Sequence, residues 1–183
     1  GSQRRHAVDV GANTGTWTRF LSPQFSLVTA IEADRRAFAA LSAALPHNAR
    51  AVHAAVCNRC EDVVLHMRQS PEQSSLLQVH PIGGGGQSEC PPIETAVIPG
   101  TTLDALFPGG ADYVKIDIEG GETLALSAMD AERWRRATLL IECHDTFEAV
   151  SAELQRLGKA IELVRHPLAG AHPNHCWAIG RPS

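Results

Sequence analysis

The 183-residue chain has few cysteines, and their spacing does not repeat. Five cysteines form an odd set with no disulfide pattern, which argues against a disulfide-stabilised fold. The pair Cys57 and Cys60 forms a lone C-x-x-C, whereas a structural zinc site would need a second pair at matching spacing. We therefore expect reduced thiols and read this pair as part of a polar turn.

Neither a strong basic charge nor a long apolar run is present. The net charge is −4, so we expect no nucleic-acid partner. No run approaches the roughly 20 apolar residues that span a bilayer, and no signal peptide precedes the first strand. Hydrophobic residues make up 44% of the chain and charged residues 20%, as in globular domains. These features predict a single domain over residues 1–183, cytoplasmic and without membrane association.

An apolar segment ends in an acid and runs into a glycine-containing loop at residues 8–15, before a predicted helix. A dinucleotide site requires G-x-G-x-x-G, with the second glycine admitting a pyrophosphate. Here only Gly11 fits, because Asn13 and Thr16 occupy the other two places and Gly15 falls one place short. The loop therefore keeps the glycine that forms the tight turn but lacks the one that lets a pyrophosphate approach the backbone. This favours a cofactor with a ribose and no pyrophosphate, such as S-adenosylmethionine (SAM), over a dinucleotide. The predicted cofactor contacts in this segment are Asp9, Gly11, Asn13, Gly15 and Thr16.

Apolar segments alternate with helical ones along most of the chain, which predicts an α/β fold with a mostly parallel sheet. The predicted strands are 8–10, 27–31, 51–56, 113–118 and 138–142, followed by an antiparallel pair at 161–165 and 176–179. The predicted helices are 16–21, one capped by Asp34 and stopped by Pro46, 101–106, 122–129 and 146–157.

A small β-insertion is expected between residues 63 and 98. Segments 63–67 and 93–98 alternate in polarity and would pair. The glycine- and proline-rich stretch 69–92 lies between them, and such long loops in compact domains are usually lids, binding loops or disordered. We expect a flexible lid that orders over substrate; the alternative is an insertion without function.

Acids end four predicted strands, at the edge where open α/β sheets bind ligands: Asp9, Glu32, Asp117 and Glu142. Glu32 lies about 20 residues after the first glycine, the place of a carboxylate that accepts ribose hydroxyls. Ala55 belongs to a small apolar strand end that could form a wall for adenine.

Asp117 and Glu142 would meet in one cleft if their strands are neighbours. Two close carboxylates repel, and one then tends to hold a proton. Mg²⁺ bound between them would remove the repulsion and lower the pKa of a coordinated hydroxyl. Asp117 is thus predicted to be a metal ligand, a cofactor contact and a catalytic residue. The alternative is that one acid binds cofactor and the other a helix N-terminus.

His144 follows Glu142 by two residues, so both side chains would point to the same side of an extended segment. An imidazole can accept a proton near neutral pH, which makes His144 the predicted general base, with Asp145 orienting it. The alternative is a structural or surface histidine. Glu119, His144, Asn174 and His175 are the predicted acceptor contacts.

Four motifs resemble those of the FkbM family of SAM-dependent methyltransferases: residues 8–15, 31–34, 114–122 and 141–144. The resemblance implies a class I (Rossmann-like) fold with seven strands, SAM as donor, and O-methylation, commonly of a sugar or polyketide hydroxyl. Metal-dependent sugar methyltransferases have an acid and a histidine spaced like Glu142 and His144. The chain's size is similar to that of small family members that methylate a mannoside 1-hydroxyl.

The chain departs from longer family members because it lacks their N-terminal helical cap over the cofactor. The 69–92 loop or a second subunit of a homodimer could cover SAM instead. Two other functions stay open. One is a metal-independent methyltransferase of a polyketide, another hydroxyl or an amine, with Glu119 or Asp117 orienting the acceptor. The other is a cofactor-binding module without chemistry, or a dehydrogenase, although the glycine positions argue against NAD.

Overall fold

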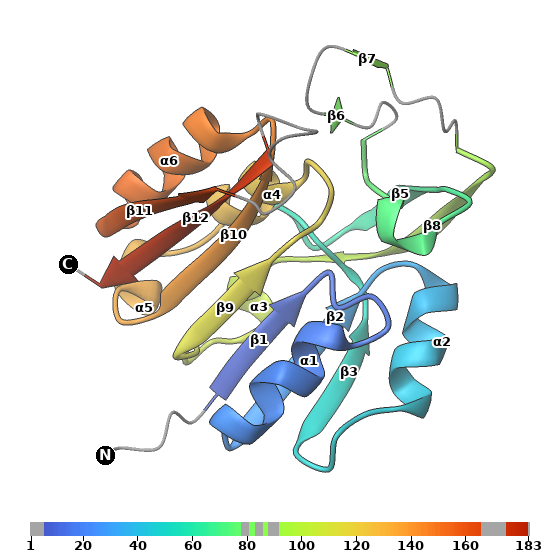
Figure 1. Cartoon of the computed structure of the whole chain (residues 1–183), viewed down its shortest axis with the longest axis horizontal. Coiled ribbons are helices and arrows are strands. Elements are labelled where there is room, and N and C mark those ends of the chain that lie inside the picture. The colour runs from blue at the N-terminus through green and yellow to red at the C-terminus, as the bar shows by residue number, and fades with distance from the viewer. Residues whose placement is uncertain (1–5, 78–80, 83–85, 88–91, 166–174, 183) are drawn as a thin grey trace.

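A seven-stranded sheet runs through the molecule in the computed structural model, which describes residues 6–77, 81–82, 86–87, 92–165 and 175–182 (Figure 1). The strand order is β11-β12-β10-β9-β1-β2-β3. All neighbours are parallel except β12, which runs antiparallel to both β10 and β11. The predicted α/β class, seven strands and antiparallel final pair are confirmed. The strands are β1 (His6–Val10), β2 (Leu27–Glu32), β3 (Ala49–His53), β9 (Tyr113–Ile116), β10 (Thr138–His144), β11 (Lys159–Arg165) and β12 (His175–Pro182).

Helices cover the two faces of this sheet. On one face α4 and α6 complete the main core, with Leu126, Val150 and Leu154 packed against strand residues such as Val10. On the other face α1 ends in Leu21, which packs with Ala7 of β1. The helices are α1 (Thr16–Leu21), α2 (Arg35–Ala43), α3 (Leu103–Leu106), α4 (Glu122–Ser127), α5 (Ala131–Trp134) and α6 (Phe147–Arg156), with 3-10 turns η1 (Ser22–Gln24) and η2 (Pro71–Gln73).

Local signals place the helix ends as expected. The Asp34 side chain accepts a hydrogen bond from the Arg36 N–H and so caps α2. Gly158 follows α6 with φ +67°, a left-handed conformation that ends helices. Among the helices that the structure describes, none has the length and apolar character needed to cross a membrane.

The predicted β-insertion is present above the sheet (Figure 1). β5 (Asp62–Met67) pairs antiparallel with β8 (Glu94–Thr101). The expected strand 51–56 is divided, however: β3 ends at His53, and β4 (Ala55–Val56) leaves β2 to pair with β8. The end of the predicted third strand therefore pairs with a strand of the insertion and not with the main sheet. Two short segments, β6 (Pro81–Ile82) and β7 (Gly86–Gln87), pair with each other.

Two of the strand ends that differ from the predicted ones lie next to the predicted site residues. β9 stops at Ile116: the Asp117 N–H still donates to the Val10 carbonyl of β1, and the chain then turns sharply at Glu119 (φ +54°). β10 continues through His144 because β12 pairs with it to that point. His144 was expected on a loop, yet it is held on a strand.

Gly11 lies where the loops after β1 and β9 touch. Its φ of +71° is left-handed, and a Cβ there would overlap the Asp117 carbonyl oxygen. Gly109 is a matched control, because a Cβ there would meet nothing within 4 Å.

We predict that Gly11→Ala lowers the free energy of unfolding by about 2 kcal/mol or more, since strain and overlap add. Gly109→Ala should change it by less than about 0.5 kcal/mol. Urea denaturation followed by circular dichroism measures both. Equal unfolding midpoints for the two variants would contradict the close approach of these loops.

Candidate functional site

A cleft opens at the carboxyl edge of the sheet, where β1 has β2 on one side and β9 on the other. This reversal of strand order is where open α/β sheets bind ligands. The wall comes from the ends of β1, β2, β4 and β9 and from the loop after β5. The lining residues are Val10, Gly11, Asn13, Ile31, Glu32, Ala33, Ala54, Ala55, Val56, Leu65, Pro71, Ser74, Ser75, Leu76, Asp117, Ile118, Glu119 and Gly121.

Glu32 is fixed in this cleft by two backbone amides. The Asn13 N–H donates to its Oε2 at 2.7 Å, and the Asp34 N–H donates to its Oε1 at 2.7 Å. Asn13 reaches this position with φ +49°, which asparagine tolerates well. Burial raises the pKa of Glu32 despite these bonds. Each carboxylate oxygen keeps a further lone pair, as the predicted ribose role requires.

Three predicted cofactor residues are absent from the described lining and lie around the loop. Asp9 is fully buried and accepts a hydrogen bond from Thr18 Oγ1 of α1 at 2.6 Å. Gly15 has φ +91°, and a Cβ there would press on Leu41 of α2. Thr16 is exposed in the first turn of α1. Asp9 and Gly15 therefore fix the conformation of the loop through contacts with α1 and α2, outside the cleft.

Lys115 is the central residue that the sequence reasoning missed. Its side chain is 1% exposed, and Nζ donates to the Gly11 carbonyl at 3.0 Å. It also lies 3.4 Å from Asp9 Oδ1 and 3.2 Å from Asp117 Oδ2. Burial would lower the pKa of Lys115, but Asp117 and Asp9 outweigh it and raise the pKa. The sequence signal that could have indicated its role is a lysine inside an otherwise apolar predicted strand.

Three groups that can ligate a metal converge beyond β9 and β10. Ligand atoms of Asp117, Glu119 and His144 all lie within 4.8 Å of one another. His144 Nε2 is 3.4 Å from Glu119 Oε2 and 4.0 Å from Asp117 Oδ1. Glu119 holds its place with a left-handed φ of +54°. Such strain in a non-glycine residue often accompanies a functional site.

Glu142 lies against Asp117, as the neighbouring strands predicted. Burial, then the Asp117 charge, raises the pKa of Glu142 to about 8. Burial alone would raise the pKa of Asp117, but Lys115 and His144 outweigh it and lower that pKa. The two carboxyls therefore share a hydrogen bond with the proton on Glu142. Its role as a metal ligand stays a prediction.

Glu122, not Asp145, orients His144. Glu122 is fully buried in the first turn of α4, where Oε1 lies 3.1 Å from His144 Nδ1. The Gly120 N–H and the Thr146 hydroxyl also donate to this carboxylate. Asp145 is exposed and has φ +60°. Burial would lower the pKa of His144, but the Glu122 hydrogen bond and the nearby carboxylates raise it to about 9.

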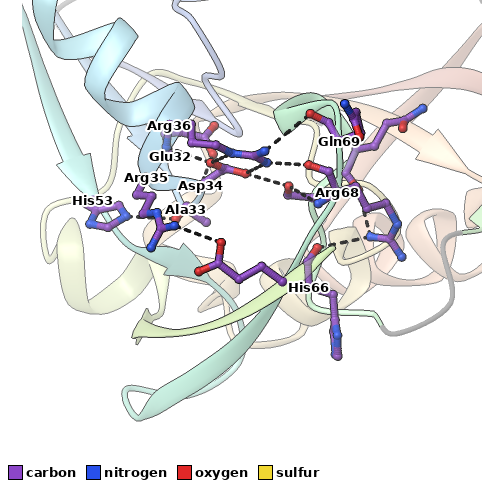
Figure 2. Close-up of polar contacts among 12 residues, drawn as sticks. Glu32, Ala33, Asp34, Arg35, Arg36, His53, His66, Arg68 and Gln69 are labelled. Carbon is purple, nitrogen blue, oxygen red and sulfur yellow. Dashed lines mark hydrogen bonds and ion pairs between the residues drawn. The ribbon is translucent and has the colours of Figure 1, made fainter. Parts of the chain in front are cut away.

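The first part of the expected lid is a packed wall of the cleft. Figure 2 shows Arg36 between the Asp34 carboxylate and the backbone carbonyls of Arg68 and Gln69. Ser74 Oγ donates to Asp34 Oδ2 at 2.8 Å. The next serine, Ser75, donates to the Glu119 carbonyl at 2.7 Å. This segment thus ties α2 to the acid cluster.

Some predicted residues lie outside the described part of the chain. They are residues 78–80, 83–85 and 88–91 of the expected lid, and Asn174. The backbone of His175 pairs with His144 across β12 and β10.

We predict that Glu122→Gln lowers the pKa of His144 from about 9 toward 6.5, because the negative charge is lost and the amide oxygen accepts only a weaker, neutral hydrogen bond. The raised pKa stabilises the fold below about pH 6.5, and this contribution disappears as pH rises through about 9. The variant should therefore lose stability mainly below pH 9. NMR titration of the imidazole in EDTA measures the pKa, with Asp145→Asn as the control. Equal shifts in both variants would contradict the assignment.

The sequence matches the Methyltransferase FkbM domain over residues 9–161. No curated protein is similar enough to count as a match. Among solved structures, an FkbM methyltransferase from Methylobacillus flagellatus aligns with 97% of this chain at 16% identity and a TM-score of 0.63. The aligned part is 44% of that protein, so this chain spans less than half its length.

Two further structures share the fold. A TehB-like SAM-dependent methyltransferase from Corynebacterium glutamicum aligns with all of this chain and 83% of its own, at 13% identity and a TM-score of 0.51. A putative methyltransferase from Streptococcus mutans, in complex with SAH, aligns over 97% and 88%, at 11% identity and a TM-score of 0.55. The matched residues 9–161 include the whole cleft and the acid cluster, and the chain belongs to the FkbM family of SAM-dependent methyltransferases.

Proposed function

We propose that this protein is a Mg²⁺-assisted O-methyltransferase that transfers the SAM methyl group to a hydroxyl of a sugar, such as a mannoside or an oligosaccharide. One observation carries the proposal: the Asp117, Glu119 and His144 cluster adjoins the cleft at the reversal of strand order. The family membership supports SAM as donor, and the acid–histidine pattern supports an alcohol acceptor.

The cleft residues fit SAM. Glu32 would accept the ribose hydroxyls, and Ala55 would pack against adenine. Gly11 leaves the space over Asp117 open, since a side chain there would fill it. When bound, SAM supplies a methyl group on a positively charged sulfur.

The acid cluster fits a hard divalent cation, because carboxylate oxygens are the ligands that Mg²⁺ prefers. Asp117 and Glu119 would hold it, and Glu142 would join after losing its proton. When bound, a cation would lower the pKa of a hydroxyl group that coordinates it. Two members of this cluster, Asp117 and Glu119, also line the cofactor cleft.

His144 would take the proton of the acceptor hydroxyl on Nε2, since Nδ1 faces Glu122. A histidine with a pKa of about 9 is protonated at pH 7 and accepts no proton. A cation held by Asp117 and Glu119 would offset two of the charges that raise the pKa of His144. With that pKa lowered, His144 Nε2 could accept the proton of the acceptor hydroxyl.

We predict that Mg²⁺ restores methyl transfer to EDTA-treated protein, measured with labelled SAM and a panel of sugars. Calorimetry should show that SAM and SAH bind and that NAD does not. Full transfer in EDTA would exclude the cation. Binding of NAD alone would exclude the methyltransferase.

Replacement of the base should separate chemistry from binding. We predict that His144→Ala lowers kcat by roughly 10²–10⁴-fold while the SAH dissociation constant stays within about twofold. Asp145→Ala is the control and should retain turnover. Unchanged kcat in His144→Ala would remove His144 from proton transfer.

The cation ligands can be told apart by one pair of variants. We predict that Glu119→Gln weakens Mn²⁺ binding, followed by electron paramagnetic resonance, by about tenfold or more. Glu142→Gln should have a smaller effect, because Glu142 carries a proton in the metal-free protein. The reverse order would assign the site to Asp117 and Glu142.

A second candidate is a metal-independent methyltransferase of a polyketide, another hydroxyl or an amine. One observation favours it: Lys115 balances Asp117, and Glu142 holds a proton, so these acids are compensated without a cation. Asp117 or Glu119 would then orient the acceptor. Turnover in EDTA with non-sugar acceptors would identify this function.

A further inference from the structure

We propose that Trp17 and Trp177 form an aromatic platform that binds the sugar ring of the acceptor beside the acid cluster. This inference rests on the proposed function and adds to it the subsite that selects a sugar. It also assigns a role to surface aromatics that the fold does not use in its core.

Three aromatic side chains meet at the surface between α1 and β12. The rings of Trp17 and Trp177 have centroids 5.8 Å apart and are tilted by 57°. Phe20 lies edge-on to Trp17, with centroids 5.4 Å apart, and is 59% exposed. Both tryptophans are partly exposed, whereas Trp134 is fully buried in the core. Partly exposed tryptophans in contact are typical of binding surfaces.

The strand register places Trp177 beside the acid cluster. Trp177 is directly opposite Glu142 in the antiparallel β10–β12 pair, so their side chains share one face of the sheet. Glu142 in turn contacts Asp117. The platform therefore borders the carboxyl groups from its β12 end.

The other end of the platform borders the cofactor loop. Trp17 is the second residue of α1, and α1 begins directly after Gly15. The helix packs on β1, and β9 and β10 lie between β1 and β12 (Figure 1). Side chains that meet from α1 and β12 must cross above these two strands. A molecule on the platform would lie between the cofactor loop and the acids.

A sugar ring matches this surface chemically. It offers C–H groups on its flat faces, which pack on aromatic rings, and hydroxyls on its rim, which donate to carboxylates. Flat aromatic walls with a few polar groups at one side orient such a ligand. An aliphatic polyketide chain has no comparable alternation of face and rim.

The test uses the SAH-loaded full chain and methyl α-mannoside as the probe. Saturation-transfer NMR should detect the sugar on the unmodified protein and on Phe20→Ala. The saturation-transfer signal of the sugar should disappear with the Trp177→Ala protein and reappear with the Trp177→Phe protein. SAH affinity within about twofold in every variant shows that each is folded. Retained signal in Trp177→Ala, or none on the unmodified protein, would overturn the platform.

Kinetics separate this inference from the proposed function. With a sugar that is methylated, Trp17→Ala and Trp177→Ala should raise the acceptor KM by about tenfold, with kcat within about threefold. Transfer to a sugar with unchanged KM in both variants would overturn the platform alone. Transfer to non-sugar acceptors only would overturn both. A dimer in solution that Trp177→Ala dissociates would assign these rings to a subunit interface and also overturn the platform.

Discussion

A buried ammonium group holds the functional end of this fold together. Lys115 Nζ contacts the Gly11 carbonyl, Asp9 and Asp117, which belong to the loop after β1, to β1 itself and to the end of β9. Burying a charge is costly unless it is paired and hydrogen-bonded. These three partners must therefore stay in place around it, which fixes the cofactor loop relative to the acid cluster. The close approach of Gly11 to the Asp117 carbonyl oxygen also holds these two loops together, because it leaves no room for a side chain at residue 11.

The architecture follows from short-range signals in the sequence. Alternating apolar segments, the Asp34 cap and the Gly158 stop predict the order of the elements of the main sheet and place most of their bounds within a few residues of the observed ones, because each signal acts locally. The division of the strand at 51–56 depended on β8, almost 50 residues later, and pairing at that distance leaves no local pattern. The extension of β10 to His144 depended on β12 in the same way.

The acids at the strand ends of the candidate site could be predicted from the sequence, whereas Lys115 was missed and the contacts of these acids could not be predicted. Acids at strand ends pointed to Glu32, Asp117 and Glu142, since parallel strands end at one edge. The partners of those acids could not be read in the same way. Glu122 reaches His144 from 22 residues away, and Asp145, its neighbour in sequence, points to solvent. Side-chain direction in turns depends on φ, which the residue types of this segment do not dictate.

The location of His144 within β10 separates a part of the chain whose length is constrained from a part whose length is not. A shift of one residue in the β10–β12 pairing would turn Glu142 and His144 to the opposite face, so lengths here are constrained. The described residues between β5 and β8 (68–77, 81–82, 86–87 and 92–93) form no pair with the seven-stranded sheet, so that register does not constrain them. The chain after Ser75 can therefore differ in length while Glu142 and His144 keep their places in the β10–β12 pairing.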